Sequence, residues 1–166
     1  KKLYLTRKRI ENKIKAQSIN DFYVCSLSTQ TIVYKGMFLA EQLSEFYPDL
    51  LDNEFTSKFA IYHQRYSTNT FPTWSLAQPF RVLAHNGEIN TLKGNINWMS
   101  AHEPRITHPF FNERINDLKP ILDPDASDSA SLDAAFELFV QTDRDMPMAK
   151  SMIIPESWSN RSDLSD

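Results

Sequence analysis

The chain has 166 residues, of which 41% are hydrophobic and 23% charged, and its formal net charge is −3. A chain of this length can bury roughly 70% of its unfolded surface in one domain, and its charge balance excludes a polyelectrolyte tail and a general nucleic-acid binder. The single cysteine, Cys25, excludes an internal disulfide framework and a cysteine-rich zinc site and favours a reducing compartment, while three glycines leave no GxGxxG or P-loop cradle.

The first predicted element is an amphipathic helix at the start of the chain. Leu3, Ile10 and Ile14 fall on one helical stripe within a strongly basic run whose single acid is Glu11. No aromatic residues or recognition motif are interleaved with the charge, so a solvated basic face is the favoured interpretation. The alternative is that this helix binds nucleic acid, and we expect no such binding.

Four segments rich in β-branched and aromatic residues are predicted as strands. They are residues 21–26, 31–35, 59–62 and 81–85. The polar link at 27–30 is short enough to join the first two as an antiparallel hairpin. Such a connection is too short for a parallel crossover, so the sequence favours an α+β domain with antiparallel sheets.

Helical patterns separate and follow these strands. Apolar residues at 39, 43, 46 and 47 predict a helix that stops at Pro48, and a second stripe over 132–140 follows the candidate N-caps at 127–129. The proline-rich stretch 102–125 predicts an irregular loop. A short helix from Met148 is expected to lead into a strand at 153–154.

Three positions could recognise a small polar ligand. Arg65 follows a predicted strand, where a guanidinium can hold a carboxylate through two hydrogen bonds, although a surface role is the commoner one. Asn86 and Gly87 suit either a hairpin turn or an oxyanion hole with two N–H donors. Asp128 suits either a helix N-cap or a partner for a substrate ammonium group.

Other chemistry is disfavoured by the pattern of residues. The four histidines lack the spacing of metal ligands and no HExxH motif occurs, so we expect no metal site. Cys25 lies within a predicted strand and is interpreted as an inert buried thiol. A Ser-His-Asp triad cannot be placed, since no GxSxG motif occurs.

A longer set of residues carries a family resemblance. The segment from Phe59 to Arg105 resembles the glutamine amidotransferase domain of the large (alpha) subunit of glutamate synthases, and the resemblance extends over nearly the whole chain. The segments that carry it are 63–70 (HQRYSTNT), Trp74, Gln78-Pro79, 83–91 (LAHNGEINT), 94–95 (GN) and 97–98 (NW), flanked by 8–10 (KRI), 33–37 (VYKGM), 47–50 (YPDL), 127–129 (SDS) and 154–156 (IPE).

The resemblance implies a class II, N-terminal-nucleophile glutaminase built as an αββα sandwich of two stacked antiparallel sheets with outer helices. In that family an N-terminal cysteine attacks the amide of glutamine, with its own α-amine as base. The carboxylate-binding arginine corresponds to Arg65, the oxyanion pair to Asn86 and Gly87, and the ammonium-binding aspartate to Asp128. The implied function is hydrolysis of glutamine to glutamate and ammonia, which is passed on to aminate 2-oxoglutarate reductively to glutamate.

One requirement of the family is not met within these residues. The nucleophile must be an N-terminal cysteine, whereas residue 1 is lysine and Cys25 is internal, with its nitrogen in a peptide bond. We therefore expect residues 1–166 to be one partial domain that lacks its nucleophile strand and is catalytically incomplete by itself. No cofactor is expected in this segment.

The resemblance also implies features of the parent enzyme. These are FMN, an iron–sulfur cluster, NAD(P)H or ferredoxin as electron donor, the rest of the synthase chain and an electron-donating small subunit. A cytoplasmic location, or a plastid in a photosynthetic eukaryote, is expected, with no nucleic acid or membrane as partner. The alternative is a non-catalytic glutamine-binding or scaffold domain that keeps the pocket without the nucleophile.

Overall fold

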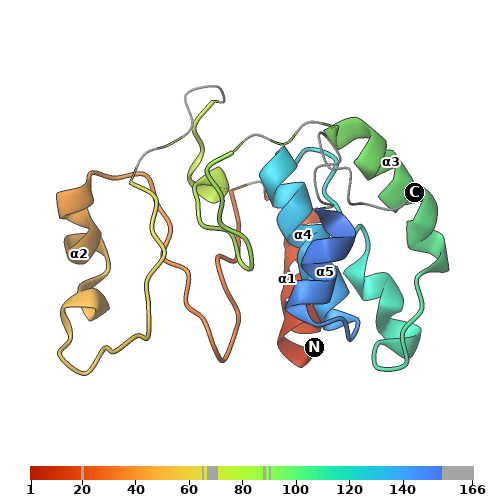
Figure 1. Cartoon of the computed structure of the whole chain (residues 1–166), viewed down its shortest axis with the longest axis horizontal. Coiled ribbons are helices and arrows are strands. Elements are labelled where there is room, and N and C mark those ends of the chain that lie inside the picture. The colour runs from red at the N-terminus through yellow and green to blue at the C-terminus, as the bar shows by residue number, and fades with distance from the viewer. Residues whose placement is uncertain (20, 65, 67–70, 88, 90, 155–166) are drawn as a thin grey trace, which may run out of the picture.

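The structure is a computed structural model that describes the chain except for residues 20, 65, 67–70, 88, 90 and 155–166 (Figure 1). Helices and extended segments make up the described part, in which no strand is formed. The α-helices are α1 (Lys2–Lys15), α2 (Leu43–Phe46), α3 (Leu92–His102), α4 (Asp128–Gln141) and α5 (Met146–Ile153). The 3₁₀ helices are Ala40–Gln42, Pro48–Leu51, Trp74–Leu76, Glu103–Arg105 and Asn112–Leu118.

A helical body forms one side of the molecule, where α1, α4 and α5 lie beside the 3₁₀ helix Asn112–Leu118 (Figure 1). Its core joins the start of the chain to residues more than a hundred positions later, because the apolar face of a helix must be buried against another element. The core consists of Tyr4, Leu5, Phe111, Leu118, Ile121 and Leu138.

Helix α1 confirms a helix at the start of the chain, but Leu3 and Ile10 of the predicted apolar stripe are exposed, and the buried residues are Tyr4, Leu5 and Arg7. The basic face is also not wholly solvated. Arg7 is only 3% exposed, which corrects the expectation of a solvated face at that position. Asn12 Nδ2 donates to the carbonyls of Asp117 and Lys119 at 2.8 and 3.0 Å, and Lys8 Nζ donates to Pro120 O at 2.7 Å. Polar residues of α1 therefore bind the proline-rich stretch to the helical body.

The C-terminal helices also follow the sequence pattern. Ser127 is the N-cap of α4, with Oγ accepting from Ala130 N at 3.2 Å, and Asp145 caps α5 by accepting from Met148 N at 2.8 Å. Helix α5 continues to Ile153, where a strand was predicted. The proline-rich stretch contains two 3₁₀ helices, so it is more ordered than the predicted loop.

In the described residues the segments predicted as four strands do not pair into a sheet, and residues 81–82 form a bend, which corrects those predictions. A strand needs hydrogen-bonding partners from another segment, whereas a helix satisfies its own backbone groups. Here the two arms of the predicted hairpin meet through a side chain, with Val33 N donating to Ser26 Oγ at 3.1 Å. The αββα sandwich is therefore not confirmed by the structure.

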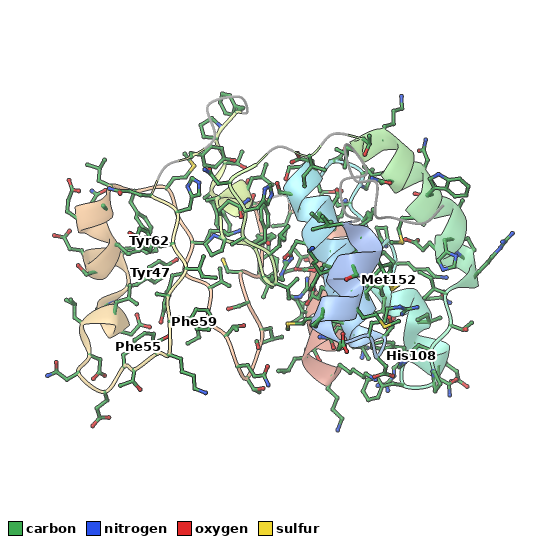
Figure 2. All side chains as sticks on the ribbon, viewed as in Figure 1. Tyr47, Phe55, Phe59, Tyr62, His108 and Met152 are labelled. Atoms are coloured by element: carbon green, nitrogen blue, oxygen red, sulfur yellow. The ribbon has the colours of Figure 1, made fainter. Side chains whose placement is uncertain are left out.

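An aromatic cluster organises the chain around α2, at the end of the molecule opposite the helical body (Figure 1). Tyr47 contacts Tyr34 and Phe46 with ring centroids 4.8 and 4.9 Å apart, and its hydroxyl donates to Lys35 O at 2.7 Å. Figure 2 places Tyr47 and Phe55 near α2 together with Phe59 and Tyr62. The helix predicted over 39–47 is thus present as a 3₁₀ turn followed by α2.

Candidate functional site

The segment around Gly87 meets the first turn of α4. Asp128 is the first residue of that helix and is half-buried, and its Oδ2 accepts a hydrogen bond from Ile89 N at 3.3 Å. Its Oδ1 accepts from the backbone N–H of Ser129 at 2.6 Å and from the Ser129 hydroxyl at 3.2 Å. Because Ser127 is the N-cap, the Asp128 carboxylate is not needed as the cap of α4.

Hydrogen bonds connect Gly87 to Asp128 through two side chains. Gly87 N donates to His85 Nδ1 at 3.2 Å, and His85 Nε2 lies 2.7 Å from Ser129 Oγ. Nδ1 must be unprotonated to accept from Gly87, so the neutral imidazole carries its proton on Nε2 and donates to Ser129 Oγ. The Ser129 hydroxyl then donates to Asp128 Oδ1. We call this set of four residues the Gly87–Asp128 bridge.

A pocket of about 220 Å³ lies beside the bridge. Asn86 lies on its wall, and Asn86 Oδ1 is 3.3 Å from His63 Nε2. The pocket is smaller than the roughly 300 Å³ at which pockets for drug-sized ligands begin. Its walls are formed by Ile61, Tyr62, His63, Gln78, Pro79, Ala84, His85 and Asn86.

The structure brings three of the four predicted site residues into one neighbourhood. Asn86 lines the pocket, Gly87 adjoins it, and Asp128 joins Gly87 through the bridge. Arg65 lies outside the described residues. The Gly87 N–H is bonded to His85 rather than open toward the pocket, a difference from the predicted pair of open oxyanion donors.

A buried charged cluster fixes the segment that leads to Gly87. Arg81 Nη2 donates to Glu11 Oε1 at 2.7 Å, and Val82 N donates to Asp133 Oδ1 at 2.9 Å. Arg81 Nη1 also lies 3.8 Å from Asp133 Oδ2. Arg7 completes the cluster by donating to Glu11 at 2.7 Å and to Glu137. The cluster thus joins α1, the segment at 81–82 and α4.

Burial dominates the electrostatics of this cluster. Desolvation raises the pKa of Asp133, which is 0% exposed, and that of Glu137. Burial opposes the charge of Arg7, yet the nearby carboxylates of Glu137 and Glu11 outweigh it and raise the Arg7 pKa. Each buried charge therefore depends on its partners, as expected for ions removed from water.

Neither this cluster nor the bridge is predicted from the sequence. Asp133 and Glu137 are four residues apart on α4, as are Arg7 and Glu11 on α1, a spacing that places each pair on one helix face. That four-residue spacing is the signal in the sequence that points to charged residues gathered on one face of α1 and of α4. It could not show that Arg81, distant in sequence from both helices, would lie between them.

Two other polar groups lie near the segment at 80–81. Lys35 is buried, its Nζ donates to Ser75 O at 3.0 Å and lies 4.3 Å from the centroid of the Phe80 ring, and burial lowers the pKa of this amine to about 8. Burial raises the pKa of the Cys25 thiol. A raised pKa disfavours the thiolate, which agrees with an unreactive Cys25.

Among the described residues, no group of three or more His, Cys, Asp or Glu side chains could hold a metal ion.

Comparison with known proteins places these residues in a family. Residues 1–166 match the family model described as glutamine amidotransferases class-II. The chain is 63% identical over 158 residues to a glutamate synthase [NADPH] large chain of Azospirillum brasilense, covering 95% of this chain and 10% of the relative. It is 52% identical to the Bacillus subtilis (strain 168) glutamate synthase [NADPH] large chain and 50% identical to a ferredoxin-dependent glutamate synthase of Pyropia yezoensis, in both cases over 99% of this chain and 11% of the relative. The chain thus spans about a tenth of the length of these relatives.

Proposed function

Because the chain belongs to the class-II glutamine amidotransferases, we propose that it is part of the glutamine-hydrolysing domain of a glutamate synthase. Glutamine and water give glutamate and ammonia at this site. The ammonia then passes to a second site of the same enzyme, where it aminates 2-oxoglutarate reductively to a second glutamate. The identity to three glutamate synthases over almost the whole chain supports this assignment.

The proposed site residues match the three polar groups of glutamine. Arg65 binds the α-carboxylate through its guanidinium, and Asp128 binds the α-ammonium group. Asn86 and the Gly87 N–H stabilise the negative charge that develops on the side-chain oxygen during attack. The observation that carries this proposal is the connection of Gly87 to Asp128 by hydrogen bonds, beside the pocket that Asn86 lines.

We propose that the nucleophile comes from sequence outside residues 1–166. The only cysteine of the chain, Cys25, has its backbone nitrogen in a peptide bond, so it has no free α-amine to act as base. Its thiol pKa is raised by burial, which also disfavours attack. Residues 1–166 then form one partial domain that contributes substrate recognition and the oxyanion hole.

The αββα sandwich remains part of this proposal. Its support is the pattern of exposed apolar residues on extended segments, such as Ile32, Phe59 and Ile61, which have the spacing and composition of strands. Unpaired strands of this kind are completed by neighbouring strands. We propose that sequence outside residues 1–166 supplies these neighbours.

The redox groups of a glutamate synthase fit other parts of the enzyme better than this segment. An iron–sulfur cluster is held by several cysteine thiolates, and this chain has one cysteine. FMN is likewise assigned to the synthase portion, with NAD(P)H or reduced ferredoxin as donor and, in the first case, a small electron-donating subunit. When bound, these groups supply the electrons for the reductive amination.

The proposed location is the cytoplasm, or the plastid if the source is a photosynthetic eukaryote. Within the part of the chain that the structure describes, no helix has both the length and the apolar character needed to cross a membrane. A ferredoxin-dependent glutamate synthase of Spinacia oleracea, 49% identical to this chain, is named as chloroplastic. Glutamine is the proposed ligand, and neither nucleic acid nor a membrane is a proposed partner.

The test compares glutamine-dependent with ammonia-dependent glutamate formation by the intact synthase. Replacing Asn86 by alanine removes one oxyanion donor, and we expect the ratio of the two rates to fall about 100-fold, the usual loss for one such donor. Ser100→Ala, on the exposed surface of α3, is the control. Equal loss of both activities would contradict the oxyanion role of Asn86.

A second measurement tests the ligand itself. Titration of the intact protein with L-glutamine is expected to show binding that Asp128→Asn weakens, because the amide lacks the charge that pairs with the ammonium group. Unchanged binding would contradict the Asp128 assignment. Binding of glutamine without any hydrolysis by the intact protein would favour the non-catalytic glutamine-binding domain.

A further inference from the structure

We propose that His85 and Ser129 are positioning residues that hold the oxyanion donor at Gly87 and the ammonium-binding carboxylate of Asp128 at a fixed separation. This inference rests on the proposed function, and it assigns a role to two side chains that do not themselves bind glutamine. Its basis is the Gly87–Asp128 bridge, in which each side chain makes one hydrogen bond toward each end.

The two ends of the bridge belong to different parts of the chain. Gly87 follows an extended segment, whereas Asp128 begins α4, forty-one positions later in the sequence. The hydrogen bond between His85 Nε2 and Ser129 Oγ, at 2.7 Å, crosses this gap. Glutamine has its ammonium group and its side-chain oxygen at opposite ends, so its recognition requires these two protein groups to keep a set distance.

Apart from the bridge, the segment at 85–87 is held through Asn86, whose Oδ1 lies 3.3 Å from His63 Nε2. Asn86 and Gly87 are exposed, and no strand pairing restrains their peptide groups in the described structure. Val82 is bonded to Asp133, and Ile89 N donates to Asp128 at 3.3 Å. His85, half-buried between these two anchors, is therefore well placed to orient the peptide that carries the Gly87 N–H.

The bridge also has one direction of donation throughout. Gly87 N–H donates to Nδ1 of His85, His85 Nε2–H donates to Ser129, and the hydroxyl donates to the Asp128 carboxylate. The chain of donors thus ends on the Asp128 carboxylate, the group that we propose pairs with the ammonium group. His85 Nδ1 is a neutral acceptor, so a developing oxyanion, being charged, competes well for the Gly87 N–H.

The experiment uses the intact synthase with Ser129→Ala, Ser129→Thr and His85→Gln. Ser129→Ala removes the acceptor of His85 and one donor to Asp128, and we expect kcat/KM for glutamine to fall about 10- to 100-fold, mainly through a higher KM. His85→Gln removes the acceptor of the Gly87 N–H and is expected to lower mainly kcat. Ser129→Thr keeps the hydroxyl and is expected to restore at least half of the wild-type kcat/KM.

The double variant tests whether the two side chains act as one unit. If they do, Ser129→Ala combined with His85→Gln loses little more than the more damaging single change, because the bridge is already broken. Losses that multiply would overturn the proposal. So would a Ser129→Ala enzyme with unchanged kcat and KM, or a Ser129→Thr enzyme as impaired as Ser129→Ala.

The outcome can be separated from failure of the proposed function. Ser100→Ala is the matched serine control, and the glutamine-to-ammonia rate ratio isolates the glutamine site from the rest of the synthase. If Asp128→Asn weakens glutamine use while Ser129→Ala and His85→Gln leave kcat and KM for glutamine unchanged, the positioning role fails and the glutamine site stands. If Asp128→Asn also has no effect, the site assignment fails and the positioning role with it.

Discussion

The helical body and the extended region of residues 21–87 contain similar apolar residues but differ in how far these side chains are exposed. Phe111 in the helical body is 0% exposed, whereas Phe71 and Tyr62 in the extended region are 87% and 83% exposed. Figure 2 shows the two regions, with His108 and Met152 on the side of the helical body and Tyr62 and Phe59 on the side of α2. A helix satisfies its own backbone and needs only a partner for one face, while an extended segment needs partners for its backbone as well.

The difference between the two regions bears on the candidate site, because the site contains residues of both. The Gly87–Asp128 bridge lies where the two regions meet, with Gly87 and His85 from the extended region and Asp128 and Ser129 from the helical body. The pocket beside it is lined by residues of the extended region. Rigid helices hold one half of the site, and the other half is held by side-chain hydrogen bonds to them. The four predictions below use hydrogen exchange of the intact protein, which measures the free energy of local opening of each region.

The largest expected difference comes from equivalent truncations in the two regions. Phe111→Ala removes a fully buried ring from the helical core and is expected to lower the local stability of α1 and α4 by about 3–5 kcal/mol. Phe71→Ala, at an exposed ring, is expected to change stability by less than about 0.5 kcal/mol. Similar losses for both variants would contradict the difference in burial.

The second prediction concerns Arg81, whose contacts connect the extended region to the helical body. Arg81→Met leaves Asp133 and Glu11 without this cation and is expected to lower the stability of the 81–87 segment by about 3 kcal/mol. Arg105→Met, at an exposed arginine, is the control. Adding Asp133→Asn removes the uncompensated charge and is expected to recover about 1 kcal/mol. No recovery would show that Asp133 and Arg81 are not coupled.

The third prediction concerns the buried amine of the extended region. The pKa of Lys35 is lowered by burial to about 8, from an ordinary value of 10.5. Above pH 8 the unfolded chain therefore binds the proton more tightly than the folded chain, and stability rises with pH until about 10.5. Lys35→Met removes this penalty, so we expect it to stabilise the segment near pH 7 by about 1–2 kcal/mol.

The pH profile provides the check on Lys35. The advantage of Lys35→Met over the wild type is expected to shrink as pH rises from 8 to 10.5, because the folded-state amine loses its proton in this range while the unfolded chain still binds it. Lys58→Met, at an exposed lysine of the same region, is expected to show no such dependence. An advantage that grows with pH would have the wrong sign and would contradict the burial argument.

The smallest expected effect separates capping from ligand binding at the start of α4. Ser127→Ala removes the hydroxyl that accepts from Ala130 N and is expected to lower the stability of α4 by about 1 kcal/mol. Because Asp128 is not the cap, Asp128→Asn is expected to have a smaller effect on α4 than Ser127→Ala. The reverse order of effects would identify Asp128 as the functional cap.

The helices of this protein could be predicted because their signals are local. The stripe of apolar residues in 3–14 and that in 132–140 each became one helix, and the serine before α4 became its N-cap. The strands could not be established in the same way. Segments such as 59–62 have strand composition, but pairing depends on a distant partner, and composition alone does not supply one.

The candidate site shows the same limit. Residue identity within the LAHNGEINT segment was enough to single out Asn86 and Gly87, and the resemblance to a family linked them to Asp128. Neither source indicated that Ser129 would receive a hydrogen bond from His85, or that Arg81 would lie among carboxylates of α1 and α4. Such contacts depend on distances between segments that are far apart in sequence.

The amino-acid sequence by itself determined the helical periodicities, the absence of a disulfide framework and membership of the class-II glutamine amidotransferases. Only the tertiary structure decided which charges are buried and which groups meet at the site. Helical periodicity and capping depend on neighbours within one or two turns, whereas burial and the Gly87–Asp128 bridge depend on the packing of remote segments. From the sequence, Asp128 suits either a helix cap or a partner for an ammonium group. Long-range packing places its carboxylate at the end of the Gly87–Asp128 bridge, where it accepts a hydrogen bond from the Ser129 hydroxyl.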